Sequence, residues 1–365
     1  MKNTFGSNIT VTLFGESHGP AIGCVIDGLA PGIKIDNDYL RSCMAKRQAR
    51  GDISTPRTEA DEVEFLSGIK NGITEGTPIC IVIKNTNVRS SAYAPYENIP
   101  RPSHADYTAE CKYHGYQDKA GGGHFSGRIT AALVAAGAII NSALADKGIV
   151  IATHIKTLGG ITDRNFENYG EDALKLRCAR IPTLSEDAGE AMIEKILEAK
   201  AASDSIGGIV ESVVAGMPAG VGEPWFDTME GVIAHALFSV PGIKGVEFGD
   251  GFGIADMRGS EANDPFRYEN GRVVTTKNSS GGIQGGITNG MPITVRAAVK
   301  PTPSISRPQG SVDLSLGENS EISISGRHDP AIIHRACAVV DAVIAISIAD
   351  MLVTRYGTDW LGGAK

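Results

Sequence analysis

Two long segments of this chain are apolar on nearly every side, and they restrict its fold more than any other sequence feature. Residues 129–147 and 331–355 consist largely of Ala, Val, Ile and Leu. Each has the length of a long helix, and a helix that is apolar all round must be covered on all sides. Strands on both sides of a helical layer would supply that cover. The sequence therefore predicts an α+β fold arranged as a layered sandwich.

The second segment is apolar enough to raise the alternative of a membrane span. Asp341 and Asp350 interrupt it, and carboxylates inside a bilayer are costly, so a buried helix is expected instead. The N-terminal stretch carries no apolar core of a signal peptide. The six cysteines lie far apart and form no CxxC pair. We therefore expect a cytoplasmic protein with reduced thiols and no membrane partner.

Apolar periodicity predicts the remaining elements. Strands are expected at 9–14, 22–26, 79–83, 206–215, 293–299 and 322–325, and further helices at 38–50, 186–202 and 228–238. No Pro-, Ser- or Gly-rich linker divides the chain, which predicts a single domain over 1–365. The stretches 22–33 and 206–222 both open with Ile-Gly and end in a turn containing Gly and Pro. One such match leaves open whether the architecture is duplicated.

Three polar islands interrupt the apolar surroundings, and each contains a histidine near a carboxylate: GESHG at 15–19, RPSHAD at 101–106 and GRHDP at 326–330. Histidine exchanges protons near neutral pH, so the islands indicate acid–base chemistry. A hydrogen-bonded structural histidine is the alternative for any one of them. The spacings typical of zinc sites are absent, so no metal is expected.

Glycine is unusually frequent, at 45 of 365 residues against a usual share of about 7%. AGGGHFSGR at 120–128 leads into a predicted helix, an arrangement that directs backbone N–H groups at an anion. Further glycine- or proline-rich loops occur at 249–253, 281–290 and 300–304. Tight turns are the alternative for each loop. Together with the histidines, the loops suggest a phosphorylated ligand that contacts several of them.

Basic residues gather in one segment although the net charge is −8, a balance that argues against a nucleic-acid partner. Between positions 41 and 57 the only acid is Asp52, and the cations are Arg41, Lys46, Arg47, Arg50 and Arg57. The run is either an anion funnel or a solvated helix face. Arginines also lie in or just after the islands, and their forks suit a substrate with several anionic groups.

FGESHGPAIGCVIDGLAPG (14–32), GHFSGRITAALVAAGAII (123–140) and GRHDPAIIHRACAVVDAV (326–343) resemble three signature regions of the chorismate synthase family. Intervening segments such as HALFSVPGIKGVEFGDGF and KPTPSI resemble that family in the same order, so the likeness covers essentially the whole chain. The chain departs from the usual pattern at 124–128, where the family usually has Arg-Ser-Ser-Ala-Arg. It also departs in its arginine run at 46–50 and at Asp341, where a glutamate is usual.

The resemblance implies an anti 1,4-elimination that converts 5-enolpyruvylshikimate 3-phosphate to chorismate and phosphate. It also implies reduced FMN as cofactor with no net redox change, and it leaves NADPH open as a reductant. The implied fold is a helical layer between two antiparallel sheets with an internal pseudo-two-fold repeat, usually in a homotetramer.

Site residues follow from the same resemblance. His18 would protonate the reduced flavin or stabilise its charge, His104 would donate a proton to the leaving phosphate, and Asp329 would help flavin N5 accept the C6 proton. The matching flavin contacts are Ser126, Pro241, Gly242, Gly285, Lys300, Pro301, Thr302, Pro303, Ser304 and Arg327. The candidate contacts for the substrate's anionic groups are Arg47, Arg128 and Arg335.

Two other functions compete with this reading. A flavin- or NADPH-dependent oxidoreductase would consume reductant in each turnover, whereas the lyase would turn over many times per flavin. A non-catalytic binder of phosphorylated metabolites would not need the three histidine islands.

Overall fold

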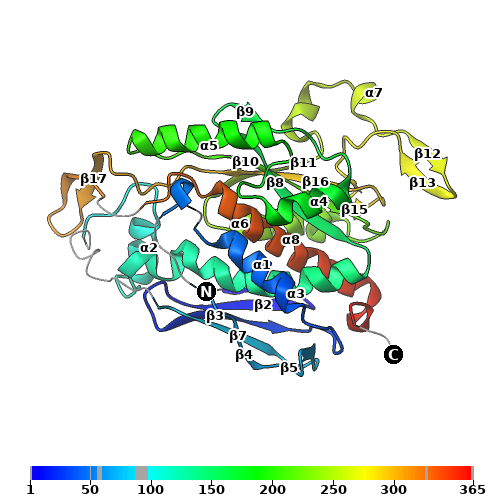
Figure 1. Cartoon of the computed structure of the whole chain (residues 1–365), viewed down its shortest axis with the longest axis horizontal. Coiled ribbons are helices and arrows are strands. Elements are labelled where there is room, and N and C mark those ends of the chain that lie inside the picture. Colours follow the sequence, from blue (N-terminus) through cyan, green and yellow to red (C-terminus); the bar gives the residue numbers. More distant parts are fainter. Residues whose placement is uncertain (1, 50, 56–59, 87–97, 325–327, 363–365) are drawn as a thin grey trace.

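Two antiparallel five-stranded sheets enclose a layer of helices in the computed structural model (Figure 1), which describes residues 2–49, 51–55, 60–86, 98–324 and 328–362. The helical layer contains α3 (Thr130–Asp146) and α8 (Ile333–Tyr356), with α1 (Asn37–Arg47) and α6 (Met229–Ser239) packed beside them. The predicted α+β sandwich is therefore confirmed.

The first sheet is built from the N-terminal part of the chain. Its strand order is β1 (Thr4–Phe5), β2 (Thr10–Gly15), β3 (Ala21–Asp27), β7 (Ile79–Lys84) and β4 (Glu64–Ser67). In β7, Ile79, Ile81 and Ile83 are buried in alternation with less buried neighbours. That period of two places one face of the sheet against the helices.

The second sheet covers the other side of the helical layer. Its strand order is β11 (Ile243–Phe248), β16 (Ile293–Val299), β10 (Gly208–Ala215), β8 (Val150–Leu158) and β9 (Ile161–Thr162). Every second residue of β16 is buried. Among the short strand pairs outside these two sheets are β5 (Ile69–Lys70) with β6 (Ile73–Thr74), and β14 (Ile283–Gln284) with β15 (Ile287–Thr288).

The helices α3 and α8 cross at close range. A Cβ atom added to Gly137 of α3 would lie 2.3 Å from the Cβ atom of Ala342 in α8, so only glycine permits this approach. Both helices are long and apolar enough to cross a membrane, but most of each apolar stretch is buried inside the protein. The two sheets thus provide the cover that these helices need.

The two halves of the chain repeat one arrangement. The similarity between the stretches 22–33 and 206–222 therefore reflects a duplicated architecture. β3 and β10 are the central strands of their sheets, and α1 follows β3 as α6 follows β10. Gly28 (φ +80°) and Gly216 (φ +84°) end these strands, and a Cβ at either would strike a carbonyl oxygen of the neighbouring segment at 1.8 and 2.2 Å. The matched glycines therefore perform the same structural task.

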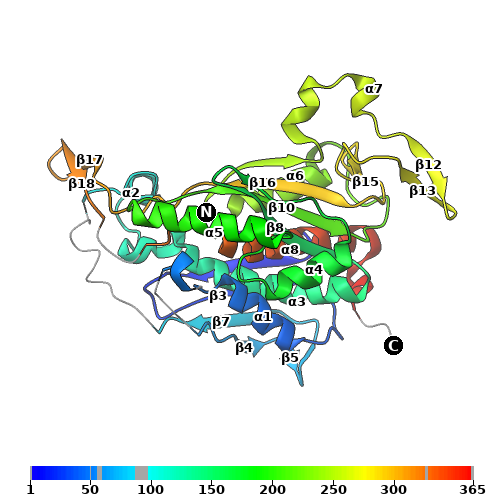
Figure 2. The ribbon, with the colours of Figure 1, turned by 45° about the horizontal axis from the view of Figure 1, so that its top comes forward.

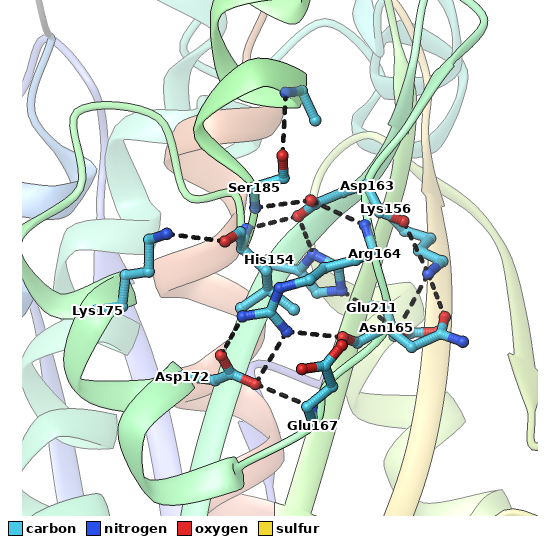
Figure 3. A network of polar contacts seen from close by, with 12 residues as sticks. His154, Lys156, Asp163, Arg164, Asn165, Glu167, Asp172, Lys175, Ser185 and Glu211 are labelled. Atoms are coloured by element: carbon cyan, nitrogen blue, oxygen red, sulfur yellow. Dashed lines mark hydrogen bonds and ion pairs between the residues drawn. The ribbon is translucent and has the colours of Figure 1, made fainter.

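An outer layer covers the second sheet. It contains α4 (Tyr169–Cys178) and α5 (Glu186–Ala201), and α5 buries Met192 and Ile196. Beneath these helices, His154 of β8 lies between the carboxylates of Asp163 and Glu211 (Figure 3), at 2.8 and 3.2 Å. Elsewhere α7 (Gly259–Ala262) and the hairpin of β12 (Phe266–Glu269) and β13 (Arg272–Thr275) project from the body (Figure 2).

Two predicted boundaries are wrong. The strand expected at 322–325 overlaps β18 (Glu318–Ile322) at Ile322 alone, and residue 325 lies outside the described residues. β18 pairs with β17 (Gln309–Asp313). The alternating burial of Ile322 and Ile324 extends past the ladder, so the apolar pattern outlasts the strand. The helix expected at 38–50 ends at Arg47, because Gln48 adopts an extended conformation. The helices α2 (Asp106–Tyr113) and α4 lie where the sequence pattern predicts none.

Candidate active site

A cavity of about 1090 Å³ brings together segments from both halves of the chain. Its wall includes the C-terminal end of α1, the segments 100–106, 117–130, 235–244 and 300–304, and the N-terminal half of α8. Two of the three polar islands reach it, through His104 and Asp329. The remaining island, GESHG with His18, lies directly behind the wall. The sequence therefore identified segments that converge on one site.

His104 is held by a network within its own loop and by the opposite half of the chain. The Arg101 guanidinium donates to both carboxylate oxygens of Asp106, at 2.8 and 2.9 Å, which closes the loop. The imidazole Nε2 lies 2.8 Å from Oγ of Ser304, and Lys300 Nζ donates to the Ser103 carbonyl at 2.6 Å. The loop is thus tied down on several sides.

Burial and then the positive charge of Arg101 lower the pKa of His104 to about 4, although Asp106 acts in the opposite direction. The imidazole is therefore neutral near pH 7 in the protein alone. Burial and the charge of Lys244 likewise lower the pKa of Lys300. His104 and Lys300 both belong to the cavity wall, and shifted pKa values in one cavity are typical of functional sites.

His18 contacts the cavity wall from behind. A Cβ atom added to Gly121 (φ +61°) would lie 2.1 Å from Cε1 and Nδ1 of His18, so glycine is required where the wall meets the ring. Gly121 itself lines the cavity, whereas His18 does not. The imidazole therefore lies against the outer side of a glycine segment of the cavity wall.

The sequence predicts that the glycine-rich segment 120–128 leads directly into an α-helix, but the structure differs. Two 3₁₀ turns, Ala120–Phe125 and Gly127–Ile129, precede α3. Oγ of Ser126 accepts from the Arg128 amide at 3.3 Å, and the Ile129 amide donates to the Ser126 carbonyl at 3.1 Å. Some of the backbone donors expected to face an anion are thus used within the turns.

Asp61 joins two of the predicted substrate arginines. Its carboxylate accepts from Nη1 of Arg47 at 3.0 Å and from Nη1 of Arg128. All three side chains are at least 94% buried at the cavity wall. Nothing in the acid-rich sequence EADEVE at 59–64 distinguishes Asp61 from a surface acid, so sequence reasoning missed it.

Asp329 is paired with the third predicted substrate arginine. Nη1 of Arg335 donates to Oδ2 of Asp329 at 2.8 Å, and the Thr55 amide donates to Oδ1 at 2.8 Å. Nε of Arg335 donates to the Arg47 carbonyl at 2.7 Å. A continuous chain of contacts therefore links Asp329 to the Arg47–Asp61–Arg128 group.

The described residues of the basic run at 41–57 do not line one common anion funnel. Arg41 pairs with Asp38 on the exposed surface, whereas Arg47 reaches the cavity. Lys46 lines a separate small crevice with Asp341. Arg50 and Arg57 lie outside the described residues. These cations do not share one site because successive residues of an α-helix, here α1, point in different directions.

Most of the predicted flavin contacts share the cavity wall: Ser126, Pro241, Gly242, Lys300, Thr302, Pro303 and Ser304. Pro301 adjoins them in sequence without lining the cavity. Gly285 lies in the turn between β14 and β15, also outside the lining, and Arg327 lies outside the described residues. The wall also holds His328, the histidine of the GRHDP island, and two histidines without a role predicted from the sequence, His124 and His235.

The cavity has an excess of positive charge among the described residues. Its wall holds eight lysines and arginines against five aspartates and glutamates. Apolar side chains from α3 and α8, among them Leu133, Val339 and Val343, form another part of the wall. Such a site suits a ligand that carries several anionic groups beside a flat apolar one.

The comparisons with known proteins agree on one family. The sequence model described as chorismate synthase matches residues 9–353. A protein named chorismate synthase from Thermococcus kodakarensis is 45% identical over 350 residues, which are 96% of this chain and 97% of that protein. Its namesake from Methanosarcina acetivorans is 46% identical, with 96% of each chain covered. A crystal structure of chorismate synthase is similar with a TM-score of 0.77 and 27% identity, over 97% of this chain and 94% of the other.

Proposed function

The chain belongs to the chorismate synthase family, and from that premise we propose how its cavity carries out the reaction. The protein is a carbon–oxygen lyase of the shikimate pathway and of aromatic amino acid biosynthesis. It converts 5-enolpyruvylshikimate 3-phosphate to chorismate and phosphate by an anti 1,4-elimination that requires a reduced flavin. The family match over 96% of the chain is the observation that carries this conclusion.

We propose FMN as the flavin, because the cavity fits it. The cavity volume of about 1090 Å³ lies just above the range of usual ligand pockets, ~300–1,000 Å³, which leaves room for a second small molecule. The apolar part of the wall suits a flat ring system, and the loops at 126, 241–242 and 300–304 would hold its polar groups. When bound, the reduced flavin supplies the transient electron that makes loss of the allylic phosphate feasible.

The substrate carries two carboxylates and a phosphate, which the excess of cations in the wall would hold. We assign Arg47, Arg128 and Arg335 to the binding of these anionic groups, although each also contacts a protein carboxylate or carbonyl. A guanidinium has five N–H donors, so it can serve an internal partner and a ligand together.

His104 would supply the proton for the departing phosphate. Its pKa is low in the protein alone, but a phosphate anion beside the ring favours the protonated form and raises the pKa. Proton uptake would then accompany substrate binding. Asp329, fixed by Arg335 and Thr55, would assist proton transfer from C6 at the flavin, and His18 would act on flavin charge from behind Gly121.

The test is turnover under anaerobic conditions with dithionite-reduced FMN and 5-enolpyruvylshikimate 3-phosphate, followed as phosphate release. Many turnovers per flavin are expected, and oxidised FMN should give none. Consumption of one reductant per product would indicate an oxidoreductase instead. A parallel assay with NADPH in place of dithionite decides whether NADPH serves as the reductant.

We further propose a cytoplasmic homotetramer. Large aromatic side chains project into solvent, with Trp225 86% exposed, Phe226 96% exposed and Phe252 82% exposed. Exposed apolar groups at this density are typical of surfaces that pair with another chain. Light scattering after size-exclusion chromatography should give four times the chain mass, and a monomer would contradict the proposal.

A further inference from the structure

The carboxylate of Asp61 lies between two guanidinium groups at the cavity wall. Each of its oxygens accepts from a different arginine, Oδ2 from Arg47 and Oδ1 from Arg128. The Asp61 side chain is 1% exposed, and the two arginine side chains are 6% and 5% exposed. A carboxylate in this position is the counter-charge that allows two cations to lie close together in a poorly solvated place.

We propose that Asp61 is a positioning residue for the reaction: it fixes Arg47 and Arg128 so that their guanidinium groups face an anionic group of the substrate. The proposal rests on the assignment of these arginines to substrate anions. Asp61 would act through the arginines and not by contact with the reacting atoms.

The other partners of the two arginines support a fixed geometry. Arg47 donates from Nε to Thr130 Oγ1 at 3.1 Å and from Nη2 to the Gly127 carbonyl at 3.1 Å. Arg128 donates from Nε to Asn85 Oδ1 at 3.0 Å. These neutral acceptors orient each guanidinium but cannot offset the repulsion between them. Among the described partners of both arginines, the Asp61 carboxylate orients the guanidinium groups and also offsets their repulsion.

The backbone of Asp61 also favours a specific role. Its φ is +51°, in the left-handed region that residues other than Gly, Asn and Asp rarely adopt. Such backbone is retained where the surrounding contacts over-determine it, often at functional sites. Replacement by glycine therefore removes the carboxylate without adding backbone strain.

The same contacts extend toward Asp329. Arg335 donates from Nε to the Arg47 carbonyl and from Nη1 to Asp329. Loss of Asp61 would therefore loosen Arg47 at one end of a chain of contacts that ends at the carboxylate assigned to the flavin. The expected defect lies in turnover as well as in substrate affinity.

The experiment is chemical rescue. Asp61→Gly leaves a space between two guanidinium groups that formate can enter. We expect kcat to fall by about 10²-fold, the loss typical of a misplaced positioning group, with a raised KM for substrate. Sodium formate should restore kcat in a saturable manner, while sodium chloride at the same concentration should not. Formate should leave the wild type unchanged or inhibit it.

Two further variants complete the test. Asp61→Asn keeps the size of the side chain but removes its charge, and it should lose turnover without rescue because the space is filled. Asp38→Asn removes an exposed arginine partner, that of Arg41, and should keep normal kcat and KM. Folding is checked by circular dichroism, and if Asp61→Gly does not fold, the turnover of Asp61→Asn decides.

The outcomes separate the two proposals. A wild type that releases no phosphate under reducing conditions would refute the function, whatever the variants do. An active wild type whose folded Asp61→Gly variant keeps normal turnover would overturn the role of Asp61. So would loss of turnover that formate does not restore, because a purely structural defect does not depend on a free carboxylate.

Discussion

Nε2 of His104 lies 2.8 Å from the hydroxyl oxygen of Ser304, although 200 positions separate the two residues in the chain. His104 precedes α3 in the first half of the chain, whereas Ser304 follows β16 in the second half. Their contact fixes the proton-carrying group against the loop assigned to the flavin. It also shows that the two halves of the repeat build one site.

Replacement of His104 by alanine should lower kcat by about 10²–10⁴, the usual contribution of general acid–base catalysis. Ser304→Ala should have a smaller effect, because it removes only a partner of the imidazole. Both are measured as phosphate release under anaerobic conditions, with flavin binding followed by fluorescence. Near-normal turnover in a folded His104→Ala protein would favour a structural histidine.

The protonation of His104 should differ from that of an ordinary histidine. Because burial and Arg101 lower its folded pKa to about 4, below the ordinary value of about 6.5, protonation favours the unfolded chain. The contribution of His104 to stability is present above pH 6.5 and is lost as the pH falls toward 4. NMR of labelled histidine should show a neutral ring at pH 5.5, and added substrate should raise the pKa. A midpoint near 6.5 without ligand would refute the assignment.

Asp341 should make the protein more stable in mild acid. Burial raises its pKa to about 6, against the favourable charge of Lys46 and a hydrogen bond from Thr153. The native state therefore holds the proton more tightly than the unfolded chain, and stability falls as the pH rises from about 4 to about 6. The full effect is roughly 3 kcal/mol. Asp341→Asn should abolish this decline in urea unfolding, and an unchanged pH profile would contradict it.

His154 should matter for stability and not for turnover. Its two ring nitrogens lie 2.8 Å from Asp163 Oδ2 and 3.2 Å from Glu211 Oε1, so the buried ring joins two carboxylates (Figure 3). Burial acts to raise the pKa of Asp163, but hydrogen bonds from His154 and two amides outweigh it and lower the pKa.

His154→Gln removes the ring that joins two carboxylates in a buried network and should cost about 3–5 kcal/mol in unfolding free energy. The matched surface change, Glu198→Gln, removes the exposed partner of Lys195 and should cost less than about 1 kcal/mol. Equal losses in the two variants would show that the buried ring carries no special weight. Turnover of folded His154→Gln should stay normal, since His154 lies outside the cavity lining.

Gly137→Ala should destabilise the protein strongly, because the added methyl would lie 2.3 Å from Cβ of Ala342 at the crossing of α3 and α8. Overpacking of this kind typically costs about 1–3 kcal/mol, and here backbone must also move. Gly253→Ala is the control: a Cβ there meets no atom within 4 Å. Thermal unfolding should separate the two variants, and equal midpoints would show that the helices adjust freely.

The sequence alone predicted much of the fold and part of the site. The all-round apolar segments required cover on both sides, and the two sheets supply it. The histidine islands led to His104 and Asp329, since proton-transfer residues stand out when they interrupt apolar surroundings. The family resemblance supplied the reaction, because its motifs extend along the whole chain.

Only the tertiary structure decided which charges meet. It paired Asp61 with Arg47 and Arg128, placed His18 behind Gly121, and separated Arg41 from the cavity. Periodicity and motifs record which face of a helix is buried, and these are local properties of the chain. An ion pair depends on distances of a few ångströms between residues far apart in sequence, and those distances exist only once the layers have packed.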